Sequence, residues 1–429
     1  MVDRMVDQRR IDDQRWVDSR TAAKHLGIHL RSLYAYVSRG LVRSVPGQEG
    51  RPRLYALDDL ERLRVRRDAR AGHGAVAAGA LRWGEPVLDS AITAITPRGP
   101  AYRGRLASEL AASGVGFENV AELLWSGYLP QESVMWPRSA PPVAQLGRLV
   151  PYGARPLDVM PILIDVAALA DPQRHDGRPD SIIARGRSVI PLLAAALSPD
   201  FAAATVTRAL GAGNVAVVAA RALGLEDSVG KILDVVLVLL ADHELNASSF
   251  TARIAASTGA DPYSCVAAAL ATLSGPRHGT AAELIARYAD EVGGPEQARA
   301  AVRALRKKGD VPPGFGHLLY PKGDPRAAPL LALARELAPD RSLKRARTLL
   351  AIVDAVEESA RRDKHRSSSQ PNVDVALATL VAALGVQPSA ASGLFAIARS
   401  AGWLAHVLEQ RAAGFLLRPR ARYVGVPLA

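Results

Sequence analysis

Long apolar segments separated by single Gly, Pro or Asp positions are the feature that most constrains this fold. Residues 155–172 (RPLDVMPILIDVAALADP) and 228–245 (SVGKILDVVLVLLADHEL) are the clearest of them. Segments of this length without alternating polar positions are typical of helices rather than strands. Aromatic residues make up only 5% of the chain, so the core must be built largely from Ala, Leu and Val, which favour close helix packing. The sequence therefore predicts a mainly α-helical fold.

Length and composition predict a cytoplasmic globular protein with two or three domains. The chain has 429 residues, of which 48% are hydrophobic and 22% are charged. Its single cysteine, Cys265, excludes an intrachain disulfide and fits a reducing compartment. The most apolar run, residues 232–241, is too short to span a bilayer, and the first residues alternate acids and bases. We therefore expect neither a membrane segment nor a signal peptide.

The first 72 residues have a pattern of their own. They carry 16 Lys and Arg against 10 Asp and Glu, a net charge of +6 out of +12 for the whole chain. Residues 18–42 predict two short helices separated by a turn at Gly27, and a glycine-rich hairpin and a third helix follow. This pattern resembles the winged helix-turn-helix domain of MerR and excisionase proteins.

That resemblance implies that the second helix and the wing contact a DNA duplex. Side chains of the helix would lie near the duplex, and arginines of the wing would lie at phosphates. A small appended domain that packs on its neighbour and binds no DNA is the alternative. The residues implied in DNA binding are Arg31, Ser32, Tyr34, Arg51 and Arg53.

A second body begins near residue 82, after a linker at residues 73–81. Within it, residues 211–216 (GAGNVA) match the dinucleotide fingerprint G-x-G-x-x-[GA], which requires a preceding strand. The preceding residues, FAAATVTRAL, are predicted to be helical. We therefore interpret residues 211–216 as a break between helices and not as a nucleotide site.

The second half of the chain contains ionisable residues in unusual settings. Glycines flank the loops that carry two of the histidines, and glycine lets the backbone approach a ligand closely. Two imidazoles on such loops, one acid and several arginines would suit a substrate rich in carboxylates. These residues are His243, His278, His317, Arg326, Asp374, Arg399 and Arg418.

This second body resembles citrate synthase over roughly residues 82–429. The family's ordered motifs are H-x-x-N-A-S, G-P-x-H-G, G-x-G-H, D-P-R, N-V-D and two late arginines. They occur here in that order as HELNAS, GPRHG, GFGH, DPRA, NVD, IAR and LRPR. The resemblance implies a nearly all-helical enzyme that condenses acetyl-CoA with oxaloacetate, giving citrate and CoA without a metal.

The resemblance also assigns the catalytic roles. Asp374 would be the general base that removes a proton from the acetyl methyl group. His278 would donate to the thioester oxygen of the developing enolate, and His317 would polarise the ketone of oxaloacetate. The residues implied to hold the two carboxylates of oxaloacetate are His243, Arg326, Arg399 and Arg418.

The resemblance to citrate synthase also implies a partner subunit, contacts to CoA and domain boundaries. The last arginine of the family reaches the site of the other subunit, so Arg418 implies a homodimer. Candidates for the CoA phosphates are Arg306, Lys307 and Lys322. The implied domains are a winged helix-turn-helix domain (1–72), a linker (73–81), a large domain (82–278 and 386–429) and a small domain (279–385).

Two alternatives stay open at the level of sequence. A 2-methylcitrate synthase would use propionyl-CoA with the same residues, since one methylene is worth only about 1–3 kcal/mol in a pocket. A transcription regulator could keep the body only to sense oxaloacetate or acyl-CoA. The loop after His278 also departs from the family, because Thr280 and Ala282 replace a Gly and an Asn.

Overall fold

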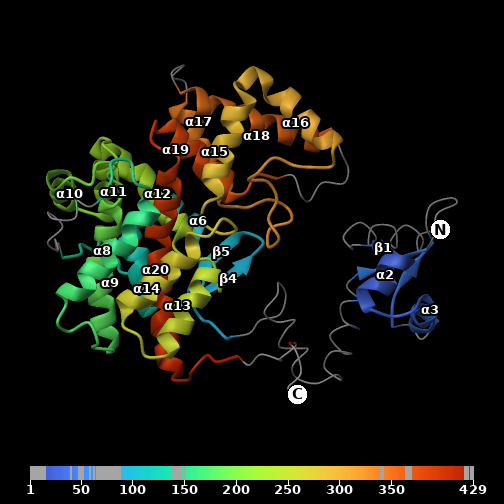
Figure 1. Ribbon diagram of the computed structural model, residues 1–429, viewed down its shortest axis with the longest axis horizontal. Coiled ribbons are helices and arrows are strands. Elements are labelled where there is room, and N and C mark those ends of the chain that lie inside the picture. Colours follow the sequence, from blue (N-terminus) through green and yellow to red (C-terminus); the bar gives the residue numbers. More distant parts are fainter. Residues whose placement is uncertain are drawn as a thin grey trace. The chain divides into compact units, whose positions relative to one another are not determined.

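The computed structural model describes residues 16–38, 41–46, 53–57, 59–60, 63, 88–137, 147, 150–338, 343–362, 370–419 and 425. Contacts divide the chain into two compact units (Figure 1). One contains residues 1–89 and 419–429, and the other contains residues 90–418.

The amino-terminal unit contains two short helices and a small antiparallel sheet. Helix α2 ends at Gly27, whose left-handed conformation (φ 59°) turns the chain towards α3. Asp18 caps α2, because its side chain accepts hydrogen bonds from the amides of Arg20 and Thr21. The sheet order is β1-β3-β2. The elements are β1 (Trp16–Asp18), α2 (Ser19–Leu26), α3 (Leu30–Ser38), β2 (Ser44–Val45) and β3 (Leu54–Ala56).

This unit has its own hydrophobic core. Ala22, Leu26 and Leu33 bring α2 and α3 together, and Tyr55 of β3 packs on them. The outer face of α3 is exposed to solvent, including Tyr34. The predicted helix, turn and helix around Gly27 thus form as expected.

The larger unit begins with a three-stranded antiparallel sheet that the sequence did not predict. The strands are β4 (Thr93–Thr96), β5 (Gly99–Tyr102) and β6 (Arg105–Leu106), in the order β4-β5-β6. They are too short to leave a clear alternating pattern in the sequence.

Helices make up most of the rest, which confirms the mainly α-helical prediction. The first group is α6 (Ala107–Ala112), α7 (Phe117–Ser126), α8 (Pro156–Ala170), α9 (Pro179–Ala195), α10 (Ala203–Leu210), α11 (Val215–Ala222), α12 (Gly230–Leu240), α13 (Ala247–Ser257) and α14 (Pro262–Leu273). The second is α15 (Ala281–Val292), α16 (Ala298–Lys307), α17 (Ala327–Leu337), α18 (Lys344–Arg362) and α19 (Val373–Ala383), and the long helix α20 (Ser389–Ala413) follows. The fully described 3-10 turns are η2 (Asp227–Val229) and η3 (Pro295–Gln297). No helix in the described part of the chain is both long and apolar enough to cross a bilayer.

Helix α20 lies at the centre of the first group. It contacts α7, α8, α9, α12, α13 and α14, and Figure 1 shows it running among them. Small residues permit this close packing. A β-carbon at Gly402 would lie 2.3 Å from an oxygen of Asp242, and one at Gly186 would lie 2.7 Å from Leu404. The scarcity of aromatic residues in the sequence thus corresponds to closely spaced helices.

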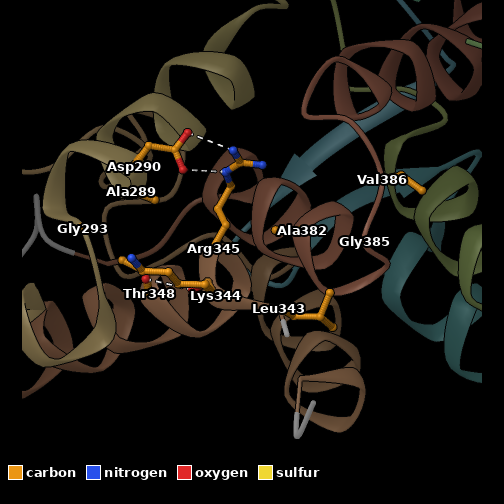
Figure 2. Close-up of a pocket in the computed structure, with 10 residues that line it drawn as sticks. All are labelled: Ala289, Asp290, Gly293, Leu343, Lys344, Arg345, Thr348, Ala382, Gly385 and Val386. Carbon is orange, nitrogen blue, oxygen red and sulfur yellow. Dashed lines mark hydrogen bonds and ion pairs between the residues drawn. The ribbon is translucent and has the colours of Figure 1, made fainter. Parts of the chain in front are cut away.

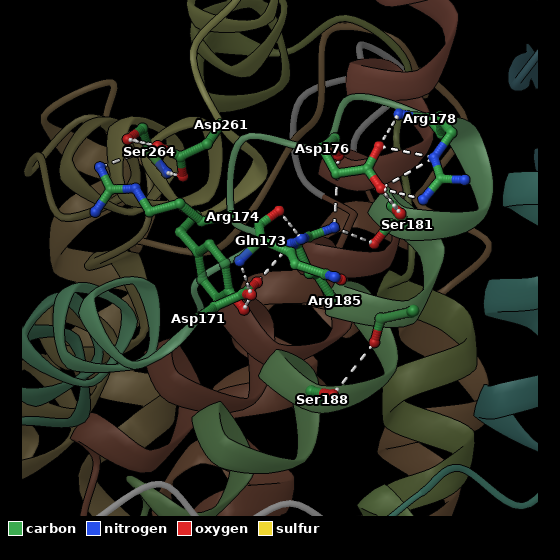
Figure 3. Close-up of polar contacts among 12 residues, drawn as sticks. Asp171, Gln173, Arg174, Asp176, Arg178, Ser181, Arg185, Ser188, Asp261 and Ser264 are labelled. Atoms are coloured by element: carbon green, nitrogen blue, oxygen red, sulfur yellow. Dashed lines mark hydrogen bonds and ion pairs between the residues drawn. The ribbon is translucent and has the colours of Figure 1, made fainter.

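Polar contacts fix the connection between α8 and α9 (Figure 3). Arg185 of α9 is buried and donates to Asp171 at the end of α8, at 2.7 Å. The hydroxyl of Tyr263 on α14 donates to the same carboxylate at 3.1 Å. Asp261, which caps α14, also pairs with Arg174 at 3.4 Å. These bonds join three of the helices that surround α20.

Helices α15 to α19 form a second group (Figure 1). Helix α19 contacts α15, α17 and α18, and α16 packs on α18. Residues 211–216 lie in the other group and join two helices, with Asn214 capping α11. The interpretation of that segment as a helix break is therefore confirmed.

Candidate active site

Residues 314–326 are joined to the start of α19 by hydrogen bonds. Gly314 has a φ of 89°, and a β-carbon there would lie 2.6 Å from Val375, so only glycine allows this approach. The joining bonds run from Gly316 N to Gln370 O (2.7 Å), from Asn372 N to Gly314 O (3.0 Å) and from Val373 N to Asp324 Oδ2 (3.1 Å). They hold His317, Arg326 and Asp374 in one region of the fold.

His317 is half-buried on this loop. Its Nδ1 accepts a hydrogen bond from the amide of Leu319 at 3.1 Å. Burial lowers the pKa of His317, and the nearby charge of Arg326 lowers it further. The ring is therefore neutral near pH 7 and carries its hydrogen on Nε2, where it can donate to a ligand.

His243 lies in the connection between α12 and α13 and is buried. Its ring centroid is 5.5 Å from that of His317. Its Nε2 lies 3.0 Å from the hydroxyl of Tyr320. Burial holds the pKa of His243 well below its usual value, and Arg326 and Arg399 add to this effect. His243 is thus a neutral imidazole in a positive environment.

His278 is half-buried between α14 and α15. Its Nε2 lies 2.9 Å from the hydroxyl oxygen of Ser248 on α13. That hydroxyl also accepts from the indole of Trp403 at 3.1 Å and donates to Oδ1 of Asn246 at 2.8 Å. Burial and the charge of Arg399 lower the pKa of His278 to about 4, so this ring is also neutral near pH 7.

Two buried arginines border the histidines. Arg326 is 3% exposed and makes a two-pronged ion pair with Asp324, at 2.9 and 2.7 Å. Burial alone would lower the pKa of Arg326, but the Asp324 carboxylate raises it above its usual range. Arg399 of α20 donates to the carbonyl of Leu240 at 3.1 Å and stacks on Phe395. Burial lowers the pKa of Arg399 to about 10, so it remains charged near pH 7.

Asp374 lies in the first turn of α19. The side chain of Asn372 caps this helix and accepts from the amide of Asp374 at 2.9 Å. Burial raises the pKa of Asp374 to about 6, with Arg326 and Arg399 opposing the rise and Asp324 adding to it. The carboxyl is therefore ionised near pH 7 but is a stronger base than an ordinary aspartate.

Six of the seven predicted site residues therefore converge. Direct contacts or mutual electrostatic effects connect His243, His278, His317, Arg326, Asp374 and Arg399. The exception is Arg418, which is exposed on the segment that follows α20. Three further residues were not predicted from the sequence, namely Ser248, Tyr320 and Asp324.

The other predicted binding residues lie on the surface. Lys322 is exposed on the His317 loop, and Arg306 and Lys307 lie at the end of α16. On the amino-terminal unit, Arg31, Ser32 and Tyr34 are exposed on α3, and Arg53 donates to Ser44 at 3.1 Å. Arg51 lies outside the described residues.

A cavity of about 350 Å³ lies elsewhere, between the ends of α15, α18 and α19 (Figure 2). Lys344 and Arg345 line it, and Asp290 pairs with Arg345 at 2.9 Å. None of the predicted site residues lines this cavity. It is therefore distinct from the cluster of histidines and arginines.

Known proteins resemble the larger unit of this chain in sequence and in fold. The sequence model of the family described as Citrate synthase, C-terminal domain, matches residues 80–420. Citrate synthase 2 of Bacillus subtilis is 39% identical over 189 residues, which cover 44% of this chain and 49% of that protein. Citrate synthase of Deinococcus radiodurans is 30% identical over 285 residues, covering 65% of this chain and 74% of that protein. The match thus spans about half the length of the Bacillus relative.

Solved structures show the same fold. The crystal structure of citrate synthase from Thermotoga maritima has a TM-score of 0.65 and 28% identity, over 81% of this chain and 95% of that chain. A ternary complex of citrate synthase from Thermoplasma acidophilum has a TM-score of 0.69 at 24% identity, over 80% of this chain and 95% of that chain. The matched family model covers well over half of the sequence. The chain belongs to the citrate synthase family.

Proposed function

We propose that this protein is a citrate synthase, an acyltransferase that condenses acetyl-CoA with oxaloacetate to give citrate and CoA. The observation that carries the proposal is the convergence of a carboxylate, three neutral imidazoles and two buried arginines from distant parts of the chain. Arginines bind carboxylates well, so the two buried arginines suit a substrate with two carboxylates. A carboxylate with a raised pKa is a stronger base, so Asp374 suits the removal of a proton from carbon.

Asp374 is proposed to begin the reaction as general base. It takes one proton from the acetyl methyl group, and the electron pair moves through the new enolate to the thioester oxygen. His278 would donate a hydrogen bond to that oxygen from Nδ1. This requires the Ser248 hydroxyl to turn from Oδ1 of Asn246 and donate to Nε2 of His278, which lies 2.9 Å from it.

His317 is proposed to act on the other substrate. Its Nε2 hydrogen would bond to the ketone oxygen of oxaloacetate, which makes the ketone carbon electrophilic. The enolate carbon then attacks this carbon, and the new alkoxide takes up a proton to form citryl-CoA. Water hydrolyses the thioester, and citrate and CoA leave. Exclusion of bulk water before the attack would keep the thioester from being wasted.

The remaining groups would bind oxaloacetate and the CoA part of acetyl-CoA. Arg326 and Arg399 match carboxylates by paired hydrogen bonds, with His243 beside them. Arg418 is proposed to complete this site in a second copy of the chain, so that the enzyme acts as a homodimer in the cytoplasm. Arg306, Lys307 and Lys322 are proposed to contact the CoA phosphates.

We further propose that residues 279–385 form a small domain that closes on a large domain made of residues 82–278 and 386–429. His317 and Asp374 would belong to the small domain and Arg399 to the large one. Closure would then complete the catalytic arrangement around both substrates.

The direct test is turnover by the purified full chain. Release of the CoA thiol and formation of citrate or methylcitrate would be measured with acetyl-CoA and with propionyl-CoA. Preference for acetyl-CoA supports the proposal, and preference for propionyl-CoA supports 2-methylcitrate synthase. Absence of turnover with either thioester rejects both enzymes and favours a ligand-sensing body.

A second function is proposed for residues 1–72, within the amino-terminal unit, as a winged helix-turn-helix domain that binds DNA. The exposure of Arg31 and Tyr34 on α3, beyond the turn at Gly27, favours this function. The full chain would be titrated with duplex DNA at several salt concentrations. Saturable binding that weakens steeply with salt supports the function, and absence of binding at low salt rejects it.

A further inference from the structure

Tyr320 lies inside the candidate active site although no motif singles it out. It is 3% exposed and follows His317 by three residues. Its ring centroid is 4.9 Å from that of His317 and 5.6 Å from that of His243. The guanidinium of Arg326 lies 5.6 Å from the same ring. The phenol is thus surrounded by three groups that are proposed to bind oxaloacetate.

The hydroxyl of Tyr320 is held by His243, whose Nε2 lies 3.0 Å from the phenol oxygen. Burial and the charges of Arg326 and Arg399 hold the pKa of His243 well below its usual value, so this ring is neutral. A neutral imidazole has one hydrogen, so the phenol donates to Nε2 in one tautomer and accepts from it in the other. In both tautomers the phenol O–H can turn towards a ligand in the site.

The hydroxyl also keeps its hydrogen throughout the working pH range. Burial raises the pKa of Tyr320 to about 12. Arg326 and Arg399 lower it, whereas Asp324 and Glu244 raise it. Tyr320 can thus donate a hydrogen bond at any pH at which an enzyme of this kind would work.

We propose that Tyr320 is an additional substrate-binding residue, whose hydroxyl donates a hydrogen bond to a carboxylate of the acceptor. A carboxylate is a stronger acceptor than a neutral imidazole, and the O–H turns by rotation about one bond. His243 then serves to hold the hydroxyl while the site is empty. This inference rests on the proposed citrate synthase activity.

The first test compares wild type with Tyr320→Phe, which keeps the ring and removes the hydroxyl. KM for oxaloacetate should rise about 10- to 100-fold, the range expected for loss of one hydrogen bond to a charged group. The values of kcat and of KM for acetyl-CoA should stay within about threefold, because the lost bond is made equally in the ground and transition states. Calorimetric titration with oxaloacetate alone should show the same loss of affinity.

Tyr288→Phe is the matched control. The hydroxyl of Tyr288, on α15, is buried and has no hydrogen-bond partner within the described structure. Its removal should leave both KM values unchanged. Tyr320→Leu, which also removes the ring beside His317, should lower kcat as well as raise KM for oxaloacetate.

The pH dependence separates the tyrosine from the histidine as donor. With Tyr320 as donor, KM for oxaloacetate should be flat between pH 7 and 9. A protonated His243 as donor would instead raise KM about tenfold for each pH unit above its pKa. If the wild type turns over and Tyr320→Phe leaves KM for oxaloacetate unchanged, this inference alone is overturned. A wild-type KM for oxaloacetate that rises about tenfold per pH unit overturns it as well. Failure of wild type to bind oxaloacetate overturns the proposed function as well.

Discussion

Replacement of Asp374 by Asn is the sharpest test of the proposed chemistry. The amide cannot accept the methyl proton, and loss of a general base typically lowers rates by about 10²–10⁴-fold. Since the arginines and His317 remain, oxaloacetate should still bind with an affinity within about threefold of wild type. Thiol release measures the rate, and calorimetry measures the binding.

The pH dependence of wild-type kcat/KM tests the raised pKa of Asp374. With a pKa of about 6, about 90% of Asp374 is ionised at pH 7 and about 9% at pH 5, so kcat/KM should fall about tenfold. The pKa of His278 is about 4, so that ring stays neutral between pH 5 and 7 and its titration does not add to the fall in kcat/KM. Activity is lost as pH falls because the base becomes protonated.

The same substitution should stabilise the fold. A pKa raised from 3.8 to about 6 disfavours the ionised carboxylate in the folded state by roughly 3 kcal/mol at pH 7.5. This penalty is complete above the folded pKa and shrinks as pH falls towards the unfolded pKa, to about 1 kcal/mol at pH 4.5. Denaturant unfolding of Asp374→Asn and wild type at both pH values measures the difference.

Asp165→Asn, which changes an exposed carboxylate on α8, is the control and should alter neither turnover nor the free energy of unfolding. The reasoning fails if Asp374→Asn retains more than about a tenth of wild-type turnover, far above what loss of a general base allows. It also fails if wild-type kcat/KM is equal at pH 5 and pH 7.

Three further substitutions test the supporting contacts. Ser248→Ala should lower kcat about tenfold or more without changing KM for oxaloacetate, because His278 loses the partner that orients its ring; steady-state kinetics measures both. Asp324→Asn should destabilise the fold by about 3–5 kcal/mol in urea unfolding, since Arg326 would be left as a buried unpaired charge. Gly402→Ala should also lower the unfolding midpoint, because its methyl group would lie 2.3 Å from a buried carboxylate oxygen.

The helical architecture could be predicted because it depends on local pattern and composition. Apolar segments such as residues 155–172 and 228–245 contain whole helices within one continuous stretch. The sheet of residues 93–106 could not be predicted in this way, because its strands have two to four residues each. The helix break at residues 211–216 was predictable, since the fingerprint lacked a preceding strand.

Some residues of the candidate site could also be predicted from the sequence, and others could not. His317 and Asp374 could be found from the sequence because GFGH and NVD are short continuous motifs. Ser248 and Asp324 stand within the motifs HELNAS and DPRA, but their contacts could not be predicted, because the fold supplies the partners. Ser248 meets His278 across 30 residues, and Asp324 accepts from the amide of Val373 across 49. Tyr320 meets His243 across 77 residues, and its place three residues after the loop histidine was its only local signal.

The hydrogen bonds between residues 314–326 and the start of α19 have a mechanical consequence. They make His317, Arg326 and Asp374 parts of a single piece, which therefore carries the proposed ketone-polarising histidine and the proposed base together. If this piece shifts relative to α20, the spacing between His317 and Asp374 is preserved, while their separation from Arg399 changes. A change in how far that piece travels would then alter the space between Asp374 and Arg399 while the spacing of His317 and Asp374 stayed the same.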